Sequence, residues 1–305
     1  QDSGTKQPTT AGEVTFGVDL TGFSTRVTQD GSSWNDGDKI GTYVLDMKTL
    51  EPVTEAANVP YVCSEEGASV SFTSTTPLKV QNDGTPVKFV AYYPYNADVR
   101  NFNYPVQLAA QERGSTACDL LYAATKEEYT YSPENEPHIS LNFTHRLAKV
   151  ILKFVNMEKE PLEVSDVRIE GMQTAASFNI QTDVLTVDES SVATINPYHN
   201  ATTGFYEAII LPSALTDSYK VSFVLDDREK EWIFTNLDIA LPQFHKGYSY
   251  TFALYIDDSG FVEMGRLENV EGGNSSAPWE DGSSEDGTAE GDKTPVSGYA
   301  FTPAD

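Results

Sequence analysis

The sequence predicts an all-β protein made of two tandem antiparallel β-sandwiches of about seven strands each, followed by an acidic C-terminal tail. Three observations lead to this fold class. Short runs of alternating apolar and polar residues recur at intervals of about 8 to 20 residues. Turn residues such as Asn82-Asp83-Gly84 separate the runs, and the composition is rich in Val, Thr, Tyr and Phe.

The division into two domains follows from the length of the chain and from one break in the pattern. With 305 residues, of which 39% are hydrophobic, the chain is long enough to bury two cores. The polar, proline-bearing stretch 131–137 interrupts the strands, and we place the domain boundary at its end. The predicted organisation is a flexible segment at 1–13, sandwiches at 14–137 and 138–258, and an acidic Gly/Ser-rich tail at 259–305.

The first predicted strand covers residues 14–20. Its apolar residues alternate with polar or small ones, which is the period of a half-buried strand at a sheet edge. These apolar residues are Val14, Phe16, Val18 and Leu20. A polar connection with one basic residue, Arg26, and a turn at 35–38 lead into the next strand.

The remaining strands are predicted from the same alternation. In the N-terminal sandwich they lie at 39–46, 59–64, 69–73, 78–80, 87–93 and 119–123, and only 106–112 hints at a short helix. In the C-terminal sandwich they lie at 146–155, 164–170, 176–180, 206–211, 219–225, 231–234 and 248–256. The run 146–155 is the most hydrophobic, and Lys149 and Lys153 mark its polar face.

The charge of the chain excludes some classes of partner. Lys and Arg number 20 against 46 Asp and Glu, which gives a net charge of −26. Binding to nucleic acid or to an anionic membrane needs clustered Lys and Arg, so we expect neither. No apolar run approaches the roughly 20 residues of a membrane span. The tail holds the acid-rich run 280–292, which loosely resembles a calcium ligand set but lacks the EF-hand pattern, so a solvated tail is favoured.

Motifs of catalysis and of cofactor binding are missing from the sequence. It contains no GxSxG, P-loop, GxGxxG or HExxH pattern, so we expect no enzyme, no cofactor and no metal site. The four histidines, His138, His145, His199 and His245, have no recognisable ligand spacing. The two cysteines, Cys63 and Cys118, are far apart and allow one disulfide at most; free thiols are favoured.

Arg26 is the candidate for proteolytic processing. A lone arginine between small polar residues, in an extended connection, is a good substrate for an arginine-directed protease. An ordinary loop arginine has the same appearance in the sequence.

Several stretches, taken in order, are similar to one family. They are Ser24-Thr25-Arg26, WNDGDKIG at 34–41, 77–94 ending in AYYP, DLLYA at 119–123, FTHRLAKV at 143–150, KGYSY at 246–250 and Trp279. Together they resemble the fimbrillin-like proteins of the Bacteroidetes, the pilin family of their surface fimbriae.

The resemblance implies a fold and a mode of assembly. It implies transthyretin-like sandwiches, export as a lipoprotein to the outer membrane, and a place in a fimbrium at the cell surface. The partners that it implies are other fimbrial subunits, and host cell or bacterial surface ligands. It also implies removal of the first strand by cleavage after Arg26 and insertion of a strand from another subunit. No cysteine precedes Cys63, so we expect any lipid-bearing cysteine to lie before the first residue of this chain.

One alternative remains open at the level of the sequence. The chain holds 16 Tyr, 15 Phe and 3 Trp, and exposed aromatic rings stack on sugars. A non-polymerising surface lipoprotein that binds host or dietary glycans would have such a composition. Most of these aromatic residues lie in the alternating strands, however, where core packing also accounts for them.

Overall fold

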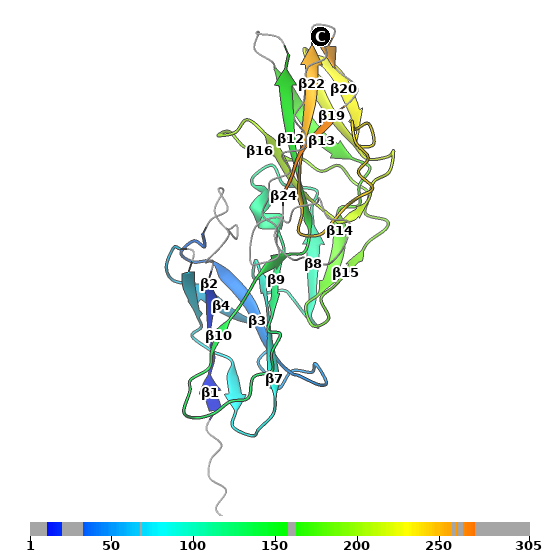
Figure 1. Cartoon of the computed structure of the whole chain (residues 1–305). Coiled ribbons are helices and arrows are strands. Elements are labelled where there is room, and N and C mark those ends of the chain that lie inside the picture. Colours follow the sequence, from blue (N-terminus) through cyan, green and yellow to red (C-terminus); the bar gives the residue numbers. More distant parts are fainter. Residues whose placement is uncertain are drawn as a thin grey trace, which may run out of the picture.

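The computed structural model describes residues 11–19, 33–67, 69–157, 163–257, 260–261 and 265–271. In this part of the chain the structure is all-β, with one short 3-10 turn, η1, at Ser115–Cys118. The strands that come early in the sequence lie at one end of an elongated molecule, and β12, β19, β20 and β22 lie at the other (Figure 1). The predicted fold class, all-β with sandwich packing, is confirmed.

The first half is built on one eight-stranded sheet with the order β10-β2-β5-β4-β3-β7-β9-β11. Its strands are β2 (Thr15–Asp19), β3 (Lys39–Asp46), β4 (Val59–Cys63), β5 (Ser69–Thr73), β7 (Val87–Tyr93), β9 (Leu121–Ala124), β10 (His138–Ser140) and β11 (Thr144–His145). A separate pair is formed by β1 (Ala11–Glu13) and β6 (Lys79–Gln81). The predicted strands 39–46, 69–73 and 87–93 coincide with β3, β5 and β7.

Two features of this sheet differ from the expectation. β10 and β11 pair with β2 and β9, so the first sheet extends to His145, beyond the boundary expected after Pro137. In addition, β2 is not an edge strand, because β10 covers the side that β5 leaves open. Both differences arise from strands of two or three residues, which are too short to show an alternating pattern.

Both faces of the central strand β3 are covered. Val44 packs into the core of the first half, together with Phe16 and Phe89. On the opposite face, Tyr43 and Leu45 join a second apolar cluster that includes residues of the second half. Because both faces are covered, almost every residue of β3 is buried.

The second half is a sandwich of two sheets. The larger has the order β16-β17-β12-β22-β23, and β24 pairs with β22; the smaller has the order β13-β19-β20. The larger sheet contains β12 (Ala148–Asn156), β16 (Tyr198–His199), β17 (Tyr206–Ile210), β22 (Ser249–Asp257), β23 (Gly260–Phe261) and β24 (Arg266–Glu271). The smaller contains β13 (Val164–Glu170), β19 (Lys220–Leu225) and β20 (Arg228–Ile233), and a further pair is β18 (Ser213–Ala214) with β21 (Gln243–Phe244). Phe223 and Phe252 come from opposite sheets and lie in the same core.

Both large sheets are mixed rather than purely antiparallel. β10 runs parallel to β2, and β12 runs parallel to β22. Parallel neighbours need a long connection, and here about one hundred residues or more separate the paired residues along the chain. The range 259–305, expected to be an acidic, solvated tail, also contributes strands, since β23 and β24 lie inside it and pair with β22.

The two halves are joined by a shared sheet. β8 (Asn103–Gln107), from the first half of the sequence, pairs with β14 (Ala175–Asn179), which pairs in turn with β15 (Val184–Val187); these strands lie between the two ends of the molecule (Figure 1). The helix hinted at 106–112 does not form, because Val106 belongs to β8. Arg146, directly after the last strand of the first sheet, makes a bidentate pair at 2.6 and 3.0 Å with Asp183, in the turn between β14 and β15.

Among the described residues, no helix has both the length and the apolar composition needed to cross a membrane.

Candidate functional site

The candidate site is the groove that β2 occupies, between β5 and β10. β2 pairs antiparallel with β5, so that Phe16 lies opposite Phe72 and Val18 opposite Val70. It pairs in parallel with β10, where the N–H of Thr15 donates to the carbonyl of Pro137 at 2.9 Å. Withdrawal of β2 would leave unpaired backbone groups on both neighbouring strands, which is an arrangement that invites another strand.

Val14 and β2 together correspond to the predicted strand 14–20, and we keep the name first strand for them. Their side chains fill the floor of this groove. Val14 and Phe16 are fully buried, and Val18 is almost so. The ring of Phe16 makes edge contacts with Tyr61 and Phe89, at centroid distances of 4.8 and 5.8 Å. Each such side chain contributes about 1.5–3 kcal/mol when fully buried. The first strand is therefore an integral part of the core, and not an appendage to it.

Tyr61 fixes the start of the first strand. Its hydroxyl donates to the carbonyl of Val14 at 2.9 Å and accepts the N–H of Leu78 at 2.9 Å. Burial raises the pKa of Tyr61 to about 12, so the hydroxyl keeps its proton at neutral pH and can donate. One buried side chain thus joins β4 to the backbone just before β2 and just before β6.

His138 closes the groove from the solvent side. Its Nδ1 lies 2.9 Å from the hydroxyl of Thr15, and its ring packs across Gly17, where a Cβ atom would lie 2.7 Å from Nε2. A side chain at Gly17 would have to displace this exposed imidazole. The sequence pattern indicated only a small residue in an alternating strand.

The chain is anchored again after the candidate cleavage site. Trp34 is fully buried and makes edge contacts with Phe72, Tyr93 and Phe143, at centroid distances of 5.1 to 5.5 Å. Its backbone forms a bridge with Gly67, next to the start of β5. Two predicted site residues, Leu20 and Arg26, lie outside the described residues, between this anchor and β2.

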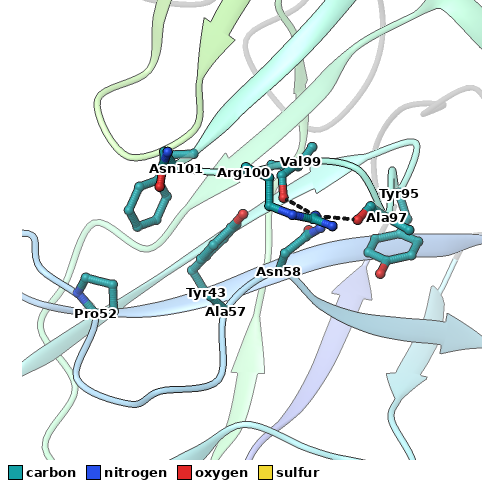
Figure 2. Close-up of a pocket in the computed structure, with 10 residues that line it drawn as sticks. Tyr43, Pro52, Ala57, Asn58, Tyr95, Ala97, Val99, Arg100 and Asn101 are labelled. Carbon is teal, nitrogen blue, oxygen red and sulfur yellow. Dashed lines mark hydrogen bonds between the residues drawn. The ribbon is translucent and has the colours of Figure 1, made fainter.

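A second candidate feature is a cavity of about 530 Å³ in the first half, close to the junction. Tyr43 rises toward Arg100, and in this view Asn58 lies between Tyr43 and Tyr95 (Figure 2). Arg100 is held by the carbonyls of Ala97 and Val99, at 2.7 and 2.8 Å. Burial raises the pKa of Tyr43 to about 12, so its hydroxyl is protonated at neutral pH.

The turn that closes this cavity has an unusual backbone. Asn101 and Phe102 both have positive φ, at 50° and 62°, in a two-residue turn between Arg100 and Asn103. Positive φ is costly for an aromatic residue. The ring of Phe102 packs on Tyr43 at a centroid distance of 4.7 Å, and its carbonyl accepts the N–H of Ile180 from the second half.

The residues considered for metal or redox chemistry are dispersed. In the described parts of the chain, no group of three or more His, Cys, Asp or Glu side chains is placed to hold a metal ion. His145 is buried and lies 2.9 Å from Asp119, whereas His138, His199 and His245 lie on other elements. Cys63 and Cys118 are both free thiols, and burial raises the pKa of each.

Comparison with known proteins identifies the family of the chain. A fimbrillin-like family model matches residues 25–279. A candidate cell adhesion protein from Bacteroides uniformis ATCC 8492 is 22% identical, with a TM-score of 0.69 over 87% of this chain and 99% of that one. A second, from Bacteroides ovatus ATCC 8483, is 15% identical, with a TM-score of 0.63 over 87% and 98% of the two chains.

A third solved structure, a candidate cell adhesion protein from Bacteroides fragilis NCTC 9343, is 15% identical, with a TM-score of 0.51 over 86% of this chain and 98% of that one. The comparison with curated proteins found no match. At these identities the solved structures establish a shared fold, and the family match, which spans well over half of the chain, establishes membership. The chain belongs to the fimbrillin-like family.

Proposed function

We propose that the protein is a non-enzymatic fimbrial subunit or adhesin of the cell surface, with other fimbrial subunits as its partners. It assembles after cleavage at Arg26, when its first strand leaves the groove and a strand from another subunit takes its place. Family membership supports the general role. Three of the similar structures carry names that point to cell adhesion.

The observation that carries the mechanism is the position of β2. The strand is buried in the core through Phe16, and Trp34, on the far side of Arg26, is anchored in the same core by its own contacts with Phe72, Tyr93 and Phe143. A cut at Arg26 would therefore separate the strand from the body and leave the new end of the body anchored. An incoming strand could then restore the backbone pairing with β5 and β10, which is binding by β-augmentation.

The experiment compares the intact chain with the chain cut by an arginine-specific protease. We expect the wild type to be cut after Arg26 and to form ordered filaments, which electron microscopy detects. Arg26→Ala should remain monomeric, whereas Arg113→Ala, which removes an exposed arginine elsewhere, should behave as the wild type. Filaments formed equally well by Arg26→Ala would show that cleavage at this residue does not control assembly.

A second candidate function, glycan binding, is favoured by the cavity near Arg100. The half-buried ring of Tyr95 and the exposed Arg100 suit a sugar that carries a carboxylate, and about 530 Å³ accommodates a small saccharide. Binding at this cavity requires no polymer. A glycan array probed with the uncut monomer tests it: acidic sugars should bind, and Arg100→Ala should abolish their signal. No binding of any acidic glycan would exclude this second function.

A further inference from the structure

The larger sheet of the second half contains a buried lysine that the assembly mechanism does not use. Lys149 lies on β12, where the sequence pattern predicts a solvent-facing side chain, yet its side chain is only 5% exposed. The residues beside it in the ladder, Ile209 on β17 and Ser249 on β22, are buried as well. Burial of an amine needs a compensating partner and removes it from water.

A carboxylate lies next to this amine, and an amide contacts the same carboxylate. Nζ of Lys149 is 2.6 Å from Oε2 of Glu207, whose side chain is 13% exposed. The other carboxylate oxygen, Oε1, accepts a hydrogen bond at 3.0 Å from Nδ2 of Asn200. One carboxylate group thus contacts both the amine of Lys149 and the amide nitrogen of Asn200.

The strand register produces this arrangement. In the ladder between β12 and β17, Glu207 lies opposite Ile151, so Lys149 is its diagonal neighbour on the same face. On the other side of β17, Tyr198 of β16 lies opposite Glu207, and Asn200 follows directly after β16. The three side chains therefore come from β12, from β17 and from the turn directly after β16, which are neighbours in one sheet.

The amide of Asn200 is polarised by its own loop. Its Oδ1 accepts the backbone N–H groups of Thr202 and Thr203, at 3.0 and 3.3 Å. Two backbone donors on one carbonyl oxygen stabilise negative charge that develops there when a nucleophile adds to the carbon. The amide thus has donors at its oxygen and an acceptor at its leaving nitrogen.

We propose that Lys149 and Asn200 form an intramolecular isopeptide bond, with Glu207 as the proton carrier. Glu207 first takes a proton from Nζ, a transfer that low polarity favours because it neutralises both groups. The lone pair of Nζ then attacks Cγ of Asn200, and the N–H groups of Thr202 and Thr203 hold the resulting oxyanion.

The second half of the step releases ammonia. Glu207 gives its proton to Nδ2, the Cγ–Nδ2 bond breaks, and ammonia leaves as the amide carbonyl re-forms. Glu207 receives the remaining Nζ proton and passes it to water. The reaction exchanges one amide for another, so no oxidant, reductant or further reactant is needed. The product joins β12 to the turn after β16, across β17.

The mass of the purified full chain, measured after denaturation, tests the bond. Relative to its calculated mass, we expect the wild type to lose one ammonia molecule more than Lys149→Arg and Glu207→Gln lose. Lys153→Arg is the matched control, since it alters the neighbouring lysine of β12, which pairs with Glu268, and it should lose ammonia as the wild type does.

Peptide mapping separates the proposed bond from other losses of ammonia. Cyclisation of Gln1 and succinimide formation at Asn200 also release ammonia, but both leave linear peptides. The isopeptide gives a branched tryptic peptide that contains Lys149 and Asn200, with no cleavage after Lys149. A wild-type chain that is cleaved after Lys149, and whose Asn200 peptide is linear, would overturn the proposal, whether or not the variants fold.

Discussion

The hydroxyl of Tyr61 donates to the carbonyl of Val14 at 2.9 Å, in the backbone that leads into the first strand. The same oxygen accepts the N–H of Leu78. Because Tyr61 is completely buried, neither backbone group can exchange this partner for water. This contact ties the strand that we propose to be removable to the permanent core of the first half.

Tyr61→Phe should destabilise the first half without altering its shape. The substitution leaves the Val14 carbonyl and the Leu78 N–H buried without a partner, which should lower the free energy of unfolding by about 1–3 kcal/mol. Chemical denaturation measures this change. Tyr255→Phe is the control, because its hydroxyl makes only a long contact of 3.4 Å with Glu268 at a half-buried site. Equal stability of the two variants would contradict the role given to Tyr61.

The cut chain should hold its first strand until a competing strand arrives. Val14, Phe16 and Val18 remain buried after the peptide bond is broken, and burial contributes about 1.5–3 kcal/mol for each side chain. Gel filtration of freshly cut protein at low concentration should therefore show the strand bound to the body, and denaturing electrophoresis should separate the two. Phe16→Ala should release the strand sooner. Immediate loss of the wild-type strand would argue against a packed core position.

Gln111 should prove essential to the junction between the halves. Its Nε2 donates to the carbonyls of Leu108 and Ile209, and the N–H of Ile209 donates to its Oε1 at 2.8 Å. Gln111→Ala leaves these buried backbone groups unpaired. Since each unpaired group costs about 1–3 kcal/mol, the free energy of unfolding should fall by at least this amount. The exposed Gln107→Ala in β8 should change it by less than about 0.5 kcal/mol. Thermal and chemical unfolding of the two variants provide the comparison.

Stability should fall at alkaline pH because of buried tyrosines. Burial raises the pKa of Tyr43, Tyr61 and Tyr250 from 10.0 to about 12. Between these values the unfolded chain loses phenolic protons that the folded chain keeps, so the free energy of unfolding decreases as pH rises. The stabilising difference is complete below pH 10 and is lost on the way to pH 12. Unfolding curves across this range should shift steadily, and a flat profile would contradict the burial of these hydroxyls.

The longer strands could be predicted because the alternation of apolar and polar residues is visible within each strand's own sequence. β3, β5, β7 and β13 begin and end where the pattern predicts. Strands of two or three residues, such as β10, contain too few residues to show a period. The parallel pairing of β12 with β22 depends on residues about one hundred positions apart, which no local pattern reports.

The burial and the partners of polar residues could not be predicted from the sequence. Lys149 was expected to face solvent, because a lysine in an alternating strand normally does, but the face it lies on is covered. β24 was missed for a related reason: it carries charges, which pair with Asp238 and Lys153 once the strand is in place. The strand at 59–64 was predicted, but its alternation carries no information on the partners of the Tyr61 hydroxyl.

The composition of the filaments tests the central claim most directly. Filaments formed after cleavage are separated from the soluble fraction, dissolved in denaturant, and analysed by mass. The proposed mechanism predicts subunits that begin at Val27, with the peptide 1–26 recovered in the soluble fraction. Filaments that retain the peptide 1–26 in equal amount with the body, or that consist of uncut chains, would show that strand replacement in this groove does not drive assembly.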